Sequence, residues 1–430
     1  MVLEAVQPPV VPNPKRTTNR RGEFYSYYAG YSEEFVEGAL AFLNLNKQSV
    51  VLDPWNGSGT TSHVAQRLGY DAFGYDINPA VVAVAKARSL GPGVKDSLDS
   101  LASDITQKAE LGYLTLKDDP LNAWASGRTA ATVRSLRQAI VTLLVDGRDS
   151  DPSIPTDVSQ LSDLAAFFFL ALFRTVRQLF RPFLASNPTW VKIPKDIAQR
   201  VDIEPKKVIE IFQSQLHTQK LHLVRPVSVE HQGTCKVEVA SSTNLPLESA
   251  TVDAVVSSPP YCTRIDYAIA TLPELAVLGF PISDRLRDLR RCMIGAPVIW
   301  EEELDVDPVW GRTCEALLND VEEHHTKASD SYYLKNLTQY FSGIFASLGE
   351  IDRVLTPHGK CCLVVQDSFY KDLHVDLPQI FSEMAANFAW KLSERVDFRK
   401  STIMGRINPR TKPYRSNFRA TETVLIFEKT

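Results

Sequence analysis

Four consecutive residues, Ser258 to Tyr261, close an apolar run that reads VVSSPPY, and their types suit the binding of an amino group. Proline fixes its own backbone angle and has no N–H donor, so two consecutive prolines give a rigid strand end whose carbonyl groups lack local partners. Rigid acceptors of this kind can hold the two N–H bonds of an amine. A loop that merely turns is the alternative interpretation.

A second group of residues suits a ligand that contains ribose. Gly57 and Gly59 lie in the stretch DPWNGSGTT, directly after an apolar strand, where positions without Cβ let the backbone approach a ligand closely. Asp76 ends the next apolar stretch, 19 residues after Gly57. This spacing is typical of a carboxylate that accepts the hydroxyl groups of a ribose. No Gly-Lys-Ser or Gly-Lys-Thr follows, which excludes a Walker-type lysine loop.

A sheet is needed to bring these residues together. The pattern predicts a strand over 49–52 that meets Asp53, a helix from about Thr60, a strand that ends in Asp76, and a helix that starts at Pro79 with Asn78 as its N-cap. This β-α-β-α order favours a parallel, doubly wound sheet. Ligands of such sheets bind beyond the carboxyl ends of the strands.

Both motifs resemble those of one enzyme family. DPWNGSGTT resembles the Asp-Pro-Phe-x-Gly-x-Gly-Thr-Thr motif of the amino-directed DNA methyltransferases, and SSPPY resembles their catalytic motif in its Ser-Pro-Pro-Tyr form. Three later stretches are similar to the family's remaining strands: 237–261, RVLTPHGKCCLVVQDS and TETVLIFEKT. The resemblance covers roughly residues 21–95 and 235–430. It implies an α/β fold of the class I methyltransferase (Rossmann-like) type, a doubly wound mixed sheet with a large, mostly helical insertion.

The resemblance also implies S-adenosylmethionine as the cofactor, without a metal, and assigns residues to it. The implied cofactor-binding residues are Tyr28, Asp53, Gly57, Gly59, Thr60, Asp76 and Ile77, and the implied catalytic residues are Ser258, Pro259, Pro260 and Tyr261. In this interpretation Ser258 and Pro259 accept the N–H bonds of the amine, and Tyr261 stacks on a base flipped out of double-stranded DNA. Ser241 stands where the family often has an acid that recognises adenine, while Ile77 is expected to pack on the adenine ring.

The identity of the methylated amine stays open among several alternatives. Serine before the prolines resembles the cytosine-N4 group more than the adenine-N6 group, which favours a site-specific DNA methyltransferase that forms N4-methylcytosine. The alternatives are N6-adenine methylation of DNA, methylation of a guanine amine in RNA, and a nucleic-acid-binding protein without activity. No Pro-Cys pair occurs, which argues against methylation at a ring carbon. Restriction-modification, phage defence and gene regulation are the expected roles, with defence-system subunits as further candidate partners.

Composition sets wider bounds on the protein. The chain has 430 residues, of which 44% are hydrophobic, so a large folded core is expected. A formal net charge of −4 gives no overall attraction to nucleic acid, and any such surface must come from local clusters. The six cysteines lack the spacing of a metal site or a disulfide framework. No signal peptide or membrane span is apparent, and a cytoplasmic location is expected.

We expect three segments in the chain and a basic DNA-contacting loop. Residues 1–21 are predicted to be an extended arm, 22–95 with 235–430 the catalytic domain, and 96–234 an inserted helical domain that is a candidate for target recognition. Within the insertion, 187–220 is locally basic and suits a helix-turn-helix-like reader or a solvated face. Residues 399–420 carry seven bases and no acid, and are expected to contact nucleic acid through Arg399, Lys400, Arg406, Arg410, Lys412, Arg415 and Arg419.

Overall fold

A computed structural model describes most of the chain. The described residues are 10–14, 25, 30–112, 114–145, 151–184, 191–223, 233–262, 265–282, 284–300, 304–400 and 420–430. Tyr28 and the greater part of the basic segment 399–420 lie outside these ranges.

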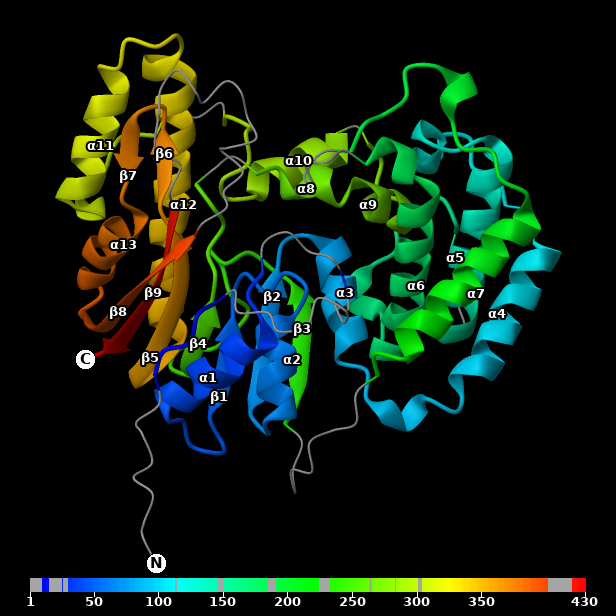
Figure 1. The fold of residues 1–430 in the computed structure, drawn as a ribbon, viewed down its shortest axis with the longest axis horizontal. Helices are drawn as coiled ribbons and strands as arrows, with labels where there is room; N and C mark the ends of the chain where they lie inside the picture. The colour runs from blue at the N-terminus through cyan, green and yellow to red at the C-terminus, as the bar shows by residue number, and fades with distance from the viewer. Residues whose placement is uncertain are drawn as a thin grey trace, which may run out of the picture.

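A seven-stranded mixed sheet forms the centre of the molecule, with strand order β3-β2-β1-β4-β5-β9-β8 (Figure 1). A separate two-stranded sheet pairs β6 with β7. The strands are β1 (Val50–Asp53), β2 (Asp71–Asp76), β3 (Cys235–Val239), β4 (Val252–Ser257), β5 (Leu355–Gln366), β6 (Ser368–Tyr370), β7 (Leu373–Val375), β8 (Trp390–Lys400) and β9 (Ala420–Lys429).

The direction of the strands confirms the expected doubly wound fold. The pairs β1–β2, β2–β3, β1–β4 and β4–β5 are parallel, whereas β9 is antiparallel to both β5 and β8. The chain moves outward in one direction through β1, β2 and β3 and then returns to place β4 on the other side of β1. The strand order therefore reverses between β1 and β4, which is where such sheets bind their ligands. This is the mixed sheet expected for a class I methyltransferase fold.

The described residues include thirteen α-helices (Figure 1). They are α1 (Glu33–Leu43), α2 (Thr60–Arg67), α3 (Pro79–Arg88), α4 (Leu98–Leu111), α5 (Gly127–Leu144), α6 (Asp163–Leu179), α7 (Pro205–Lys220), α8 (Tyr267–Ala270), α9 (Leu272–Leu278), α10 (Asp284–Cys292), α11 (Arg312–Glu322), α12 (Leu334–Val354) and α13 (Leu377–Ala386). A π-helical turn, Ser329–Tyr333, precedes α12. None of the described helices is both long and apolar enough to cross a bilayer.

Alternating residues along each strand fill two cores on opposite faces of the sheet. Val51, Val256 and Val364 are buried in one core together with residues of α1 and α2. Leu52 and Val255 are buried in the other core, which contains residues of α11, α12 and α13. This period of two is what a sheet covered on both faces requires.

Helices α4 to α7 lie between β2 and β3 in the chain, where the helical insertion was expected, and they share a core with α3. Nine consecutive residues of α3, Pro79 to Ala87, are buried, and α6 supplies a run of buried apolar side chains from Ala165 to Phe173. Figure 1 shows this group of helices beside the β3 edge of the sheet. The division of the chain into separate domains at residues 95 and 235 stays a prediction.

Two buried arginines of α5 hold the insertion together, and one of them also connects it to the segment that follows β4. Arg134 is fully buried, pairs with Asp119 at 2.8 Å, and donates at 2.6 Å to the carbonyl groups of Ala276 and Val277 at the end of α9. Arg137 donates to the carbonyl groups of the segment 152–154. Arg134 thus supplies donors to the carbonyl groups in the last turn of α9, where a helix leaves carbonyls without partners of its own.

Candidate active site

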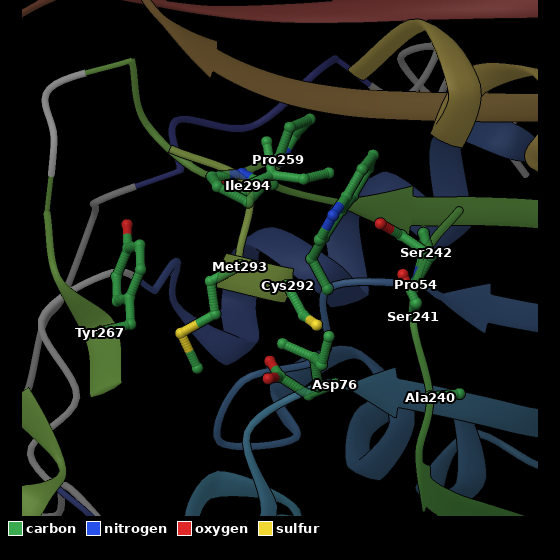
Figure 2. A pocket seen from close by; sticks show the side chains of 14 residues that line it. Pro54, Asp76, Ala240, Ser241, Ser242, Pro259, Tyr267, Cys292, Met293 and Ile294 are labelled. Carbon is green, nitrogen blue, oxygen red and sulfur yellow. The ribbon is translucent and has the colours of Figure 1, made fainter. Parts of the chain in front are cut away.

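A pocket of about 660 Å³, counted with the solvent space at its mouth, lies beyond the carboxyl ends of β1, β2, β3 and β4 (Figure 2). Each strand contributes the residues that follow it, and a segment at the end of α10 closes the far side. The lining residues are Pro54, Trp55, Asp76, Ile77, Ala240, Ser241, Ser242, Ser258, Pro259, Pro260, Tyr267, Cys292, Met293 and Ile294. The pocket therefore brings together both motifs that the sequence singled out.

Asp76 presents its carboxylate to this pocket. One carboxylate oxygen accepts the backbone N–H of Gly57 at 3.0 Å, and the other accepts that of Asn78 at 2.9 Å. An ionised carboxylate has about four acceptor positions, so two remain for a ligand. Burial raises the pKa of Asp76 to about 6, because a charged group is less stable away from water. Figure 2 shows the carboxylate directed toward Cys292 and Met293 across the pocket.

The glycine turn has the shape that its sequence predicts. Gly57 and Gly59 both have positive φ, 49° and 82°, a region that other residues rarely adopt. A Cβ on Gly59 would lie 2.7 Å from the Cβ of Ala85 in α3. The turn is therefore packed directly against α3, and α2 begins at the next residue, Thr60, as expected.

Asp53 lies behind the pocket rather than in it. Its side chain is almost fully buried and accepts hydrogen bonds from the Ser257 hydroxyl at 2.5 Å, the Trp55 backbone N–H at 3.1 Å and the Tyr31 hydroxyl at 3.1 Å. Burial raises the pKa of Asp53 to about 6. The structure thus shows Asp53 joining the ends of β1 and β4. Thr60 is also outside the pocket lining, and its hydroxyl accepts a hydrogen bond from Arg88 at 3.1 Å.

The Ser-Pro-Pro strand end is held by hydrogen bonds on both sides. The Ser258 hydroxyl donates to the Val364 carbonyl of β5 at 3.0 Å, and the Tyr340 hydroxyl of α12 donates to the Pro260 carbonyl at 3.0 Å. Among the described residues no hydrogen bond reaches the Pro259 carbonyl. The lone pairs of the Ser258 oxygen and the Pro259 carbonyl are the acceptors that this arrangement leaves for a ligand.

The structure places a different tyrosine in the pocket from the one that the motif indicates. Tyr261 is buried, with 8% of its surface exposed, and is absent from the pocket lining. Tyr267, the first residue of α8, does line the pocket and lies across it from Ser241 and Ser242 (Figure 2). Stacking by Tyr261 stays a prediction.

The wall formed by Cys292, Met293 and Ile294 was not found by sequence reasoning. Cys292 is the last residue of the arginine-rich helix α10, and Met293 and Ile294 follow it. Arg290 of this helix pairs with Asp266 at 2.7 Å, and Asp266 also caps α8 by accepting the Ile269 N–H. The ion pair therefore connects the helix before Met293 to the helix that carries Tyr267.

The proposed DNA-contacting residues can be placed only in part. Arg399 is exposed at the end of β8, where it pairs in register with Thr421, and Lys400 pairs with Ala420. Gln366, at the carboxyl end of β5, pairs with Glu422 near the start of β9. The end of β8 and the start of β9 therefore lie at the same edge of the sheet as the pocket. The other five basic residues lie outside the described ranges: Arg406, Arg410, Lys412, Arg415 and Arg419.

The basic stretch in the insertion has one α-helix in its described part. That helix is α7, and it follows a single 3-10 turn, Ile197–Gln199. The described residues of 187–220 therefore contain no pair of α-helices of the helix-turn-helix type. Lys192, Lys195 and Lys207 are exposed there.

The cysteines take no part in a metal or disulfide site in the described ranges. No group of three or more His, Cys, Asp or Glu side chains is arranged there to hold a metal ion, and no disulfide joins any of the six cysteines. Burial raises the pKa of Cys362 to about 12, which makes its thiol a poor nucleophile.

Comparison with known proteins agrees with the motifs. Residues 12–87 match the family described as "N6_N4_Mtase: DNA methylase". The chain is 25% identical over 308 residues to "Type II methyltransferase M.BsoBI" of Geobacillus stearothermophilus, a match that covers 63% of this chain and 55% of that protein. The chain thus spans about half the length of this curated relative. These two matches confirm the resemblance to amino-directed DNA methyltransferases.

Two solved structures align with most of the chain at low similarity. One is titled "Crystal structure of MccD protein", with 9% identity, 92% of this chain and 96% of that chain covered, and a TM-score of 0.31. The other is the rRNA methyltransferase aviRa from Streptomyces viridochromogenes, with 10% identity, 93% and 86% of the chains covered, and a TM-score of 0.29.

Proposed function

We propose that the protein is an S-adenosylmethionine-dependent DNA methyltransferase that methylates an exocyclic base amine, with N4 of cytosine as the acceptor atom. The observation that carries this proposal is the convergence of Asp76 and the Ser258-Pro259 acceptors in one pocket at the switch point of the sheet. The family match at residues 12–87 and the similarity to a type II methyltransferase support it.

The pocket residues fit the proposed cofactor. Asp76, with two acceptor positions open, would hold the ribose hydroxyls, and Ile77 would pack on the adenine ring. Ser241 and Ser242 follow β3, beside Asp76 and Ile77 in the sheet order, and would border the adenine. When bound, S-adenosylmethionine supplies an electrophilic methyl group. The glycine turn, which has no Cβ at two positions, lets the backbone approach the rest of the molecule.

The Ser-Pro-Pro strand end would orient the amine. An exocyclic amine is a weak nucleophile because its lone pair is delocalised into the ring. Ser258 and Pro259 would each accept one of its N–H bonds, which draws the nitrogen toward tetrahedral geometry and frees its lone pair. The cofactor would supply the methyl group to this nitrogen, and the proton that the amine loses would pass to water. Acceptors fixed before the reaction lower the barrier because they need not reorganise.

The choice of cytosine depends on the serine. Ser258 resembles the cytosine-N4 form of the motif more than the adenine-N6 form, and its neutral hydroxyl takes the place of a carboxylate at this position. The same proposal includes flipping of the base from double-stranded DNA and contact of the basic segment 399–420 with phosphates. It also includes a cytoplasmic location and a role in restriction-modification or phage defence.

Mass spectrometry of nucleosides tests the proposal. Purified protein is incubated with isotope-labelled S-adenosylmethionine and, separately, with DNA and RNA that contain diverse sequences. The expected product is labelled N4-methylcytosine in DNA, strongly reduced with a Ser258→Ala variant that lacks the hydroxyl acceptor. Labelled N6-methyladenine would keep the enzyme class and reject the cytosine assignment. Label in RNA alone would reject DNA as the substrate.

A further inference from the structure

One face of α12 contacts the pocket from behind at four points. Asn336, Tyr340, Gly343 and Ser347 follow one another at intervals of four, three and four residues, the spacing that places side chains on a single helix face. All four belong to the buried residues of this helix. Each of them touches a different part of the segments that line the pocket.

Two of these contacts hold the segment that carries Cys292, Met293 and Ile294. The side-chain amide of Asn336 donates to the Ala296 carbonyl at 3.0 Å. Gly343 leaves room for Ile294, since a Cβ at this position would lie 3.0 Å from the Ile294 Cγ1 atom. The pocket wall therefore rests on α12.

The other two contacts reach opposite ends of the pocket. The Ser347 hydroxyl exchanges a hydrogen bond with the Ser242 hydroxyl at 2.9 Å, at the end that follows β3. The Tyr340 hydroxyl donates to the Pro260 carbonyl at 3.0 Å, at the strand end that follows β4. One helix thus fixes the adenine end and the amine end of the proposed site independently.

The Tyr340 hydroxyl is buried and stays protonated, so its hydrogen bond to the Pro260 carbonyl persists. Only 3% of the Tyr340 surface is exposed, and burial raises the pKa of its hydroxyl well above the usual value, so the group remains a donor at any working pH. Gly295, with a φ of 79°, lies between Tyr340 and the catalytic motif, because its Cβ would be 3.1 Å from the Tyr261 carbonyl and 3.6 Å from the Tyr340 ring. Tyr340 therefore lies directly beneath the Pro260-Tyr261 peptide.

We propose that Tyr340 is a positioning residue for methyl transfer, which fixes the Ser258 and Pro259 acceptors by holding the Pro260 carbonyl. This inference rests on the proposed function. Proline has no N–H with which to anchor its own peptide, so the orientation of this strand end depends on bonds made to its carbonyl groups. With the Pro260 carbonyl tied to α12 and the Ser258 hydroxyl tied to β5, the Pro259 carbonyl between them has a fixed direction. Tyr340 itself does not line the pocket.

Three variants that each remove one hydroxyl group test this role. Tyr340→Phe removes the hydrogen bond to the Pro260 carbonyl. Ser347→Ala removes the bond to Ser242 from the same helix face. Tyr332→Phe is the matched control, because the Tyr332 hydroxyl also donates to a carbonyl, that of Pro297 at 3.2 Å, which lies outside the pocket lining.

Single-turnover methyl transfer and calorimetric titration of S-adenosylmethionine are measured for each variant, together with thermal unfolding. For Tyr340→Phe we expect a transfer rate lower by about 10- to 100-fold, since small misplacements of reacting groups have effects of this size, and a cofactor affinity within about twofold of wild type. Ser347→Ala should instead weaken cofactor binding. Tyr332→Phe should leave both quantities unchanged.

Wild-type transfer by Tyr340→Phe would overturn the proposal. A parallel loss of rate, cofactor affinity and thermal stability in this variant would also overturn it, because that result describes a purely structural residue. Failure of the wild-type protein to methylate any nucleic acid is a distinct result, which would reject the proposed function itself and this inference with it.

Discussion

The carboxylate of Asp76 accepts the backbone N–H of Gly57 at 3.0 Å, so the acid at the end of β2 fixes the glycine turn that follows β1. The two parts of the proposed cofactor site are therefore one hydrogen-bonded unit. The same carboxylate also accepts the Asn78 N–H at the start of α3. Its remaining acceptor positions are oriented before any ligand arrives.

Asp76→Asn should weaken cofactor binding by about 10- to 100-fold, because it removes a charged acceptor from hydrogen bonds to hydroxyl groups. Isothermal titration with S-adenosylmethionine measures the loss, and thermal unfolding verifies that the variant is folded. Wild-type affinity in a folded variant would remove Asp76 from the ribose site.

Cofactor binding should also weaken at mildly acidic pH. The pKa of Asp76 is raised by burial to about 6, so the carboxylate takes up a proton as the pH falls through this value. If only the ionised form binds well, affinity should fall by about fourfold between pH 7.5 and pH 5.5. In Asp76→Asn the affinity should be almost independent of pH. A residual decrease in that variant would point to Asp53, whose pKa is also raised to about 6.

Tyr267 and Tyr261 should respond differently to substitution by leucine. Tyr267 lines the pocket, so Tyr267→Leu should reduce methyl transfer by about 5- to 100-fold through lost stacking on the base, with cofactor affinity unchanged. Tyr261 is buried, so Tyr261→Leu should mainly lower the free energy of unfolding. Rate assays measure the effect of each variant on methyl transfer, and urea unfolding measures its effect on stability. A folded Tyr261→Leu with lost activity, beside an active Tyr267→Leu, would assign stacking to Tyr261.

Gly59→Ala should destabilise the fold and weaken cofactor binding. The positive φ of Gly59 would strain an alanine by about 1–3 kcal/mol, and the new Cβ would meet Ala85 at 2.7 Å. Gly127→Ala is the control, because a Cβ there meets no heavy atom within 4 Å and Gly127 begins an α-helix. Thermal unfolding should show a loss for the first variant and none for the second.

Arg134→Ala should lower the free energy of unfolding by about 3–5 kcal/mol, because it leaves Asp119 buried without its cationic partner and removes two hydrogen bonds to carbonyl groups of α9. Arg128→Ala, on the same helix, removes exposed ion pairs with Asp202 and Glu204 and should leave stability close to that of the wild type. Chemical unfolding measures both variants. Equal losses of unfolding free energy in Arg134→Ala and Arg128→Ala would show that the buried ion pair stabilises the fold no more than the exposed pairs do.

Local signals in the sequence predicted the first half of the sheet closely. The strand that ends in Asp76, the N-cap Asn78 and the start of α2 at Thr60 agree with the structure, because glycine turns, N-caps and apolar runs act over a few residues. The carboxyl edge of the sheet then brought Asp76 and Ser258 together as expected.

Side-chain direction at the strand ends could not be predicted in this way. Asp53 and Asp76 both end a strand, yet only Asp76 reaches the pocket, because Ser257 and Tyr31 enclose Asp53 from elements distant in sequence. Tyr267 and Met293 enter the pocket for a similar reason. Their approach depends on the packing of α8 and α10, for which no local pattern exists.

Helix α3 packs against both the sheet and the helical insertion, and this limits how the protein can be re-engineered. Its side chains are buried on all sides, between the sheet on one side and α6 with its neighbours on the other. A cassette exchange that replaced residues 96–234 with a foreign module would leave much of that apolar helix in water, directly beside Asp76. Engineering of a new binding specificity would therefore call for grafting at surface loops, with the helical insertion left in place.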